Sequence, residues 1–209
     1  MKYVKILGMA AVAAMALMAF VGAGTASATV LCSTNTSPCP AGQKWPLGTG
    51  IEFTVTSKTS AAWLGTESEE IETCTGGKLK GEITNAGSAT EAVKIKISEF
   101  SWTSCTFPTK TLEIGTLELL NISGTSDATI NMSSGFKFTM NTIIFGSCVY
   151  GSGTGIDMGT LKGGASGAAG IDVNAVLGGG EGICCPSAKW SEHYTLTSPS
   201  GTALYVKPS

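Results

Sequence analysis

Cysteine is the residue type whose number and spacing in this sequence could support defined chemistry. All seven cysteines lie beyond residue 28, and no two of them form a C-x-x-C pair. The single histidine, His193, cannot complete a familiar Cys/His metal set. We therefore predict structural disulfides, with no cofactor and no metal. The candidate cysteines are Cys32, Cys39, Cys74, Cys105, Cys148, Cys184 and Cys185.

The order of these cysteines along the chain predicts three bridges and leaves one thiol over. Adjacent cysteines rarely bond each other, because the resulting ring is strained. In the chain-entropy model, closing a loop of about 30 residues stabilises a fold by roughly 3 to 4 kcal/mol. The predicted pairs are Cys32 with Cys39, Cys74 with Cys105, and Cys148 with either Cys184 or Cys185.

Groups that could serve nucleophilic or acid–base catalysis are sparse. A histidine-dependent mechanism would have to use His193, and no G-x-S-x-G motif precedes it. The spare cysteine could act as a nucleophile, and Glu113 with Glu118 could form a glycosidase pair. Each glutamate lies on the polar side of an apolar strand, where solvation explains it, and the cysteine lies in a loop. No catalytic residue is predicted.

Tryptophan could serve in sugar recognition, because its ring stacks on the apolar face of a sugar. The sequence has four: Trp45, Trp63, Trp102 and Trp190. Three of them lie in apolar strand registers, where packing in the core is expected. Trp45 lies in the N-terminal arm, so it is the candidate for an exposed ring that contacts a ligand.

Two further segments resemble ion or phosphate sites but lack the layout that such sites need. The four glutamates Glu67, Glu69, Glu70 and Glu72 do not follow the D-x-D-x-D-G pattern of a calcium loop, so a solvated acidic edge is favoured. The glycines between Gly151 and Gly182 lead into another alternating strand and do not open a helix. We therefore interpret these glycines as residues of turns between strands.

Alternating apolar and polar residues predict that β-strands position all of these groups. Val93, Ile95 and Ile97 lie on one face, and the alternation then changes phase, which predicts a β-bulge near Ser98-Glu99. From 189 to 197, Trp190, Glu192, Tyr194 and Leu196 share one face while His193 lies on the opposite, solvated face. No segment beyond residue 28 sustains a helical period with a start signal. The predicted fold is an all-β, immunoglobulin-like β-sandwich.

A similar pattern recurs along the chain at a constant offset. Gly81-Glu82-Ile83 and Val93-Lys94-Ile95 recur as Gly159-Thr160-Leu161 and Ile171-Asp172-Val173, each 78 residues further on. Each copy reads as a hairpin between two cysteines. The pattern predicts two related halves of the sandwich, at about 51–125 and 126–209.

The first 28 residues have the layout of a secretory signal peptide. Two lysines precede an apolar run from Ile6 to Val21, and the small residues Ala26-Ser27-Ala28 follow it. The run is shorter than the roughly 20 residues that a membrane-spanning helix needs. We therefore predict a cleaved signal peptide at 1–28, a disulfide-pinned irregular arm at 29–50, and the sandwich at 51–209. A secreted or cell-envelope location follows, with no stable membrane insertion after cleavage.

Composition narrows the classes of partner. Removing 28 residues from the 209 leaves 181, and losing two lysines changes the formal charge from −2 to −4. All basic residues are lysines, so no guanidinium group can form bidentate contacts with phosphate. A mildly acidic chain of this kind is not expected to bind nucleic acid.

A set of structural motifs spans nearly the whole chain: the leader with Ala26-Ser27-Ala28, Leu31-Cys32 to Cys39-Pro40, Gly115 to Glu118, Cys148 to Gly151, Cys184 to Trp190, and Tyr194 to Val206. Together these segments resemble a family of uncharacterised, cysteine-containing secreted proteins that is abundant in soil actinobacteria of the Solirubrobacterales type. The matching motifs are structural, and the resemblance implies secretion without implying an activity. The Cys184-Cys185 doublet departs from the single cysteine expected there. The cysteine and hairpin module is also similar to that of exported alkane-oxidation activators.

The prediction from sequence is a secreted, disulfide-stabilised β-sandwich that acts as a non-catalytic extracellular or cell-surface binding or structural protein, with a partner of unknown identity. The first alternative is a carbohydrate-binding module that uses exposed aromatic rings. The second is a secreted hydrolase, which would need a cleft joining His193 or paired carboxylates to a nucleophile.

Overall fold

The computed structural model describes residues 29–55, 62–65, 70–142, 146–165, 167–177, 185 and 187–209. The predicted signal peptide at 1–28 lies outside these ranges, as do residues 178–184, which include Cys184. Among the described residues, none belongs to a helix with the length and apolarity to cross a membrane.

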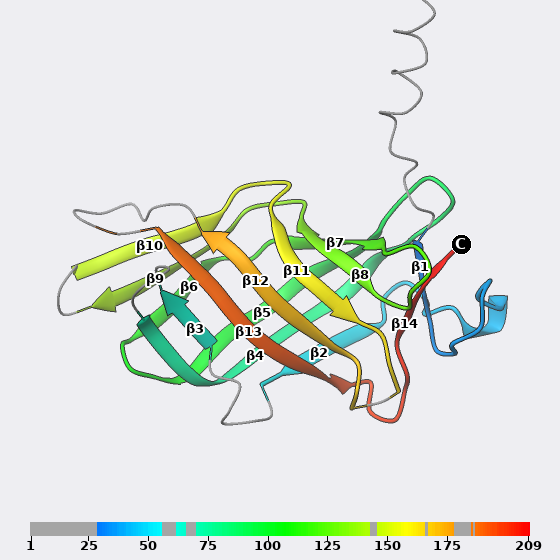
Figure 1. Ribbon diagram of the computed structural model, residues 1–209, viewed down its shortest axis with the longest axis horizontal. Helices are drawn as coiled ribbons and strands as arrows, with labels where there is room; N and C mark the ends of the chain where they lie inside the picture. Colours follow the sequence, from blue (N-terminus) through cyan, green and yellow to red (C-terminus); the bar gives the residue numbers. More distant parts are fainter. Residues whose placement is uncertain are drawn as a thin grey trace, which may run out of the picture.

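A single large antiparallel sheet dominates the structure and closes on itself (Figure 1). Consecutive strands are neighbours, and β12 also pairs with β13, so the sheet forms a closed barrel with up-and-down topology. The strands of the barrel are β2 (Gly50–Thr54), β4 (Glu70–Ala86), β5 (Val93–Cys105), β7 (Thr116–Asn121), β8 (Ala128–Met132), β11 (Asp157–Lys162), β12 (Gly170–Leu177) and β13 (Ala188–Ser198).

The short strand β3 (Ala62–Gly65) continues the line of β2 between β4 and β13. Thr54 of β2 pairs with Lys78 of β4, and Ala62 of β3 pairs with Cys74 of the same strand. The ladder of described residues on this line is thus interrupted between β2 and β3, opposite the middle of β13.

Alternation explains why these segments form a barrel with a filled interior. In β7 every second residue is buried, and in β13 the buried positions run from Ala188 to Leu196 at intervals of two. The intervening polar side chains face outward. The buried apolar side chains of the barrel strands include Ile51, Phe53, Leu79, Ile83, Val93, Ile95, Ile97, Leu117, Leu119, Ile130, Met132, Leu161, Ile171, Val173 and Leu196.

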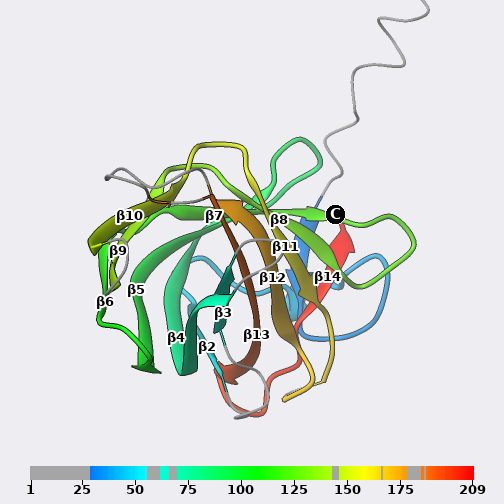
Figure 2. The same ribbon diagram turned by 60° about the vertical axis from the view of Figure 1, so that its left-hand side comes forward.

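A three-stranded sheet packs against one end of the barrel. It consists of β6 (Thr109–Glu113), β9 (Phe136–Thr142) and β10 (Gly146–Ser152), in the order β10-β9-β6. Its inner face carries Phe136 and Phe138, whose rings contact those of barrel residues. Figures 1 and 2 both place this sheet at the end of the barrel opposite β1 and β14.

The other end is occupied by the two chain ends of the described structure. Strand β1 (Thr29–Cys32) pairs antiparallel with β14 (Tyr205–Pro208), and a loop closed by the Cys32–Cys39 disulfide follows β1. After a single 3-10 turn, η1 (Ala41–Gln43), the chain returns to β1. The arm predicted at 29–50 therefore has its bridge, but it begins with a buried strand where irregular structure was expected.

The all-β prediction is confirmed, while the predicted immunoglobulin-like sandwich gives way to a closed barrel. Both architectures bury one face of each strand, so both produce the same alternation along the sequence. The decisive contact is between β13 and its two neighbours β12 and β2, and β2 lies more than 130 residues earlier in the chain. Periodicity carries no information about such a pairing.

Two local predictions from the sequence are confirmed. Lys80 pairs with Glu99 and Gly81 pairs with Ile97, so Ser98 is the extra residue of a bulge. Both hairpins of the proposed repeat exist, as β4–β5 and β11–β12. Each proposed half supplies four barrel strands, but the bridges differ: Cys74–Cys105 joins β4 to β5, whereas the later bridge starts from β10.

Candidate functional site

The candidate site is a buried carboxyl group on the inner face of β13. Alternation turns Trp190, Glu192 and Tyr194 into the barrel, where their exposed fractions are 2, 5 and 0%. His193 lies on the outer face, as the sequence predicts, and its Nδ1 is 2.5 Å from Oδ1 of Asp172. The only imidazole is therefore directed away from the buried carboxyl.

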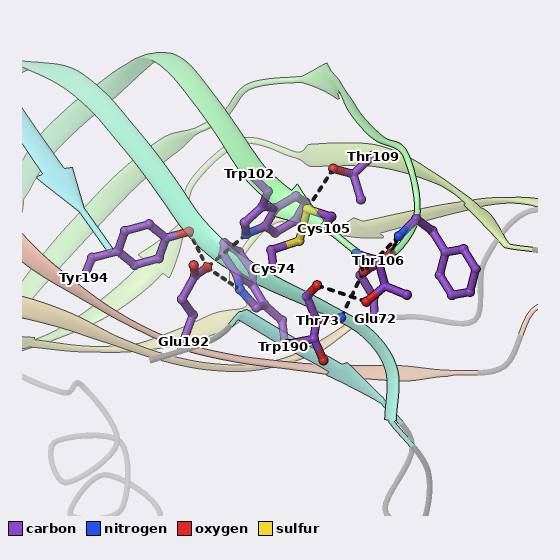
Figure 3. Close-up of a disulfide and its surroundings, with 11 residues drawn as sticks. Glu72, Thr73, Cys74, Trp102, Cys105, Thr106, Thr109, Trp190, Glu192 and Tyr194 are labelled. Atoms are coloured by element: carbon purple, nitrogen blue, oxygen red, sulfur yellow. Dashed lines mark hydrogen bonds between the residues drawn. A yellow bond between two sulfur atoms is a disulfide. The ribbon is translucent and has the colours of Figure 1, made fainter. Parts of the chain in front are cut away.

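Three side-chain donors converge on one oxygen of Glu192 (Figure 3). The indole Nε1 of Trp102 and that of Trp190 each lie 3.0 Å from Oε2, and the hydroxyl of Tyr194 donates to the same atom. Trp190 and Tyr194 come from β13 itself, whereas Trp102 comes from β5. The network thus joins two strands that are not neighbours in the barrel.

The second oxygen of Glu192, Oε1, is buried without a hydrogen-bond partner. Burial away from water disfavours the charged form and raises the pKa of Glu192 from 4.5 to about 7, although the three donors to Oε2 favour the anion. The pKa of Tyr194 is raised well above its ordinary value by burial and by the charge of Glu192. The carboxyl group of Glu192 therefore changes between its protonated and its charged form near neutral pH.

Aromatic rings surround this carboxyl group and exclude water from it. The ring centres of Trp102 and Trp190 are 5.3 Å apart in an edge-to-face arrangement, and the ring centre of Phe100 lies 4.5 Å from that of Trp102. Two rings of the three-stranded sheet pack on these indoles: the centre of Phe138 is 4.6 Å from that of Trp102, and Phe136 stacks on Trp190 with centres 5.8 Å apart. The sheet therefore covers the aromatic end of the barrel.

The surroundings of Glu192 limit what its carboxyl group can do. A cavity of about 30 Å³ lies inside the barrel, lined by apolar and aromatic side chains that include Leu79, Met132 and Trp190. Glu192 is not among the residues that line this cavity. A general acid or base must reach a proton on a substrate, whereas Glu192 is only 5% exposed and its Oε2 is covered by three side-chain donors. Binding and releasing a proton is the chemistry that the described surroundings of Glu192 support.

A second buried carboxyl belongs to Glu72, close to the Cys74–Cys105 disulfide (Figure 3). Its oxygens accept hydrogen bonds from the backbone N–H groups of Thr73, Thr106 and Phe107 at 2.8 to 3.2 Å. One predicted member of the solvated acidic edge is thus buried. The side chains of Glu67, Glu69 and Glu70 lie outside the described structure.

Glu72, Cys74 and Cys105 bring ligand-type atoms within 4.8 Å of one another, the one such group among the described residues. Both sulfur atoms are bonded to each other, so neither can act as a thiolate ligand. The carboxylate oxygens are occupied by backbone donors. These residues do not fit a metal ion.

The structure confirms all three predicted disulfide pairs and resolves the alternative between the adjacent cysteines. Cys148 bonds Cys185, which fastens β10 of the small sheet to the segment before β13. Cys184, the cysteine left over, lies outside the described residues. The other two bridges are Cys32–Cys39 and Cys74–Cys105.

The exposed ring predicted for Trp45 is wrong, because this side chain is only 4% exposed. The backbone N–H of Trp45 donates to the carbonyl of Leu31 at 3.0 Å, which folds the arm back onto β1 and buries the indole in the core. Of the other tryptophans, Trp190 is buried, Trp102 is half-buried, and the side chain of Trp63 lies outside the described structure.

The Glu192 network was missed from the sequence, although one signal for it was present. The alternation from 189 to 197 places a glutamate on the same face as Trp190 and Tyr194, and an acidic residue on an apolar face needs partners. Nothing in the local sequence indicates the contact with Trp102, which is 90 residues away.

Comparisons with protein-family models, with curated proteins and with solved structures found no match to this chain.

Proposed function

We propose that this protein is an exported, non-catalytic scaffold that works through its outer surface in the extracellular space or on the cell surface. The observation that carries the proposal is the packing of the described barrel strands, which bury their inward apolar side chains against one another. Eight-stranded barrels either fill with side chains or hold one small ligand. The packing of the described residues favours the first kind, so we assign the contacts with a partner to the outer surface.

The three disulfides support the extracellular part of the proposal. They join the arm to itself, β4 to β5, and the small sheet to the barrel, so they fasten each layer of the fold. Bridges of this kind persist in oxidising compartments. The signal peptide at 1–28, and membership of the secreted family that the sequence resembles, are parts of the same proposal.

The test is to express the full chain with its own leader in an export-competent bacterium. We expect the protein in the medium or on the envelope, with Thr29 as its first residue and three bridges in a non-reducing peptide map. A chain that stays in the cytoplasm with free thiols would contradict the proposal. So would a hydrolytic activity, found in a broad substrate screen, that Glu192→Gln abolishes.

A further inference from the structure

Lys207 in β14 is the one buried cation among the described residues, with 6% of its surface exposed. It lies at the end of the barrel that holds β1 and β14, opposite the aromatic sheet (Figures 1 and 2). Burying an ammonium group is costly unless an anion or a set of acceptors compensates for the lost water. The partners of Lys207 therefore indicate what this position is built to do.

The partners of the Lys207 ammonium group are neutral. Its Nζ donates to Oδ1 of Asn35 at 2.5 Å and to Oγ of Ser126 at 2.8 Å, and the Ser126 hydroxyl donates to the same Asn35 oxygen at 2.8 Å. The Tyr205 ring centre lies 5.7 Å from Nζ. Two of the three ammonium donors are used, and the charge has no counter-ion within the described residues.

The carboxylate next to Ser126 in the sequence is already engaged elsewhere. Asp127, next to Ser126, accepts hydrogen bonds from Nζ of Lys162 at 3.1 Å and from the backbone N–H of Gly163 at 2.9 Å. It makes no ion pair with Lys207. Within the described part of the chain, the buried cation thus has neutral acceptors and no negatively charged partner.

Lys207 lines a groove of about 360 Å³ whose other lining residues are all uncharged. Asn35 presents its oxygen to the ammonium group, so its NH₂ group is left as a donor, and Ser37 also lines the groove. With the third N–H of Lys207, these side chains supply hydrogen-bond donors beside a positive charge.

The groove is held in shape before any ligand enters. The Cys32–Cys39 bridge closes the short loop that carries Asn35 and Ser37. On the opposite wall, the backbone N–H of Val206 donates to the carbonyl of Ser126 at 2.9 Å. Such preorganisation reduces the entropy that a ligand must lose on binding.

We propose that this groove is a binding site for a small oxyanion, either a free ion or the phosphate, sulfate or carboxylate group of a larger molecule. The anion supplies the missing counter-charge of Lys207 and accepts charge-assisted hydrogen bonds from it and from Asn35. This site is separate from the Glu192 network and does not depend on where the protein is located.

The experiment is an NMR titration of the disulfide-intact protein with sodium phosphate, sulfate and acetate at constant ionic strength. We expect saturable shifts of the amide signals that line the groove with at least one anion. Tighter binding of phosphate and sulfate than of acetate assigns a doubly charged ligand, and tighter binding of acetate assigns a carboxylate. Equal binding of all three supports an oxyanion site that selects for negative charge alone. No saturable shift with any of the three anions would overturn the proposal.

Two variants and one control make the test specific. Lys207→Gln removes the charge and is expected to weaken binding about tenfold or more. Asn35→Asp supplies a built-in anion of the same size, so it is expected to abolish binding while the fold is kept. Lys96→Gln changes an exposed lysine on the barrel wall and should bind like the original protein. Undiminished binding by Asn35→Asp would overturn the proposal even if Lys207→Gln failed to fold.

Discussion

The molecule buries two glutamates to almost the same extent but stabilises them in different ways. Glu72 is 4% exposed and Glu192 is 5% exposed. Hydrogen bonds from backbone N–H groups cover both oxygens of Glu72. Glu192 has three side-chain donors on one oxygen and none on the other.

The two carboxylates differ in the kind of hydrogen-bond donor that each one satisfies. Phe107 lies beyond the end of β5, and its backbone N–H donates to the carboxylate of Glu72, so Glu72 satisfies a donor that has left the ladder. The N–H of Thr106 is shared between Glu72 and the carbonyl of Thr73 in β4. The donors to Glu192 are the indole groups of two tryptophans and the phenol group of a tyrosine, and they lie in the apolar interior beside the carboxyl group. We infer that Glu72 stabilises the fold as an anion and that Glu192 stabilises it best when protonated.

The largest expected effect is the pH dependence that Glu192 creates. Its pKa is raised from 4.5 in the unfolded chain to about 7 in the fold, so the folded protein holds a proton that the unfolded chain releases. The free energy of unfolding should therefore fall as the pH rises from about 4.5 to about 7, and then level off. The total change from this group is on the order of 3 kcal/mol.

Glu192→Gln isolates that contribution, because glutamine has the shape of the protonated acid. The variant should match the original protein near pH 5 and be more stable at pH 8 in urea unfolding followed by tryptophan fluorescence. If the variant and the original protein differed in stability by the same amount at pH 5 and at pH 8, the carboxyl group would not titrate between these two pH values.

Glu72→Gln should have the opposite sign at neutral pH. Its NH₂ group would face the N–H of Phe107, which now donates to Oε2 at 2.9 Å, so this donor would keep only its longer bond to the other oxygen, at 3.2 Å. We expect a loss of about 1 to 3 kcal/mol in the free energy of unfolding. Glu113→Gln is the control, because Glu113 is 56% exposed and its ion pair with Lys137 is a surface contact. A neutral Glu72→Gln would remove the contrast between the two glutamates.

The sequence alone predicts which side chains of a strand face inward and which face outward, but it does not predict that the sheet closes into a barrel. Alternation predicted the bulge at Ser98 and placed Glu192 and His193 on opposite faces, because both depend on the period of two within one strand. The pairings of β13 with β12 and with β2 depend on three-dimensional packing. For that reason a sandwich was predicted where a barrel forms.

The same limit applies to the residues that build the candidate sites. Trp45 was predicted to be exposed because its surroundings in the sequence are polar and rich in proline, yet the arm folds back onto β1 and buries it. Trp102 and Glu192, like Asn35 and Lys207, meet only through the fold. The disulfide pairs were predictable because cysteines are few and the candidate pairs follow one another along the chain.

Trp102→Phe tests whether the donors to Glu192 matter mainly when it is charged. The variant keeps an aromatic ring against Phe100 and Phe138 but removes one hydrogen bond to Oε2. We expect a loss of about 1 to 2 kcal/mol at pH 8 and a smaller loss at pH 5, since hydrogen bonds to charged groups are the stronger ones. Phe100→Leu is the control, and its cost should be the same at both pH values.

The smallest effect concerns the room left for the unpaired oxygen of Glu192. A β-carbon added at Gly77 would lie 2.9 Å from Oε1 of Glu192 and 3.3 Å from Cε1 of Tyr194. The carboxyl must then move against three donors, so Gly77→Ala should cost about 1 kcal/mol although alanine suits a strand better than glycine. Gly50→Ala, where nothing lies within 4 Å, should cost nothing. A stabilising Gly77→Ala would mean that the donors do not hold the carboxyl in place, and the contrast with the firmly bound Glu72 would then lie in mobility as well as in charge.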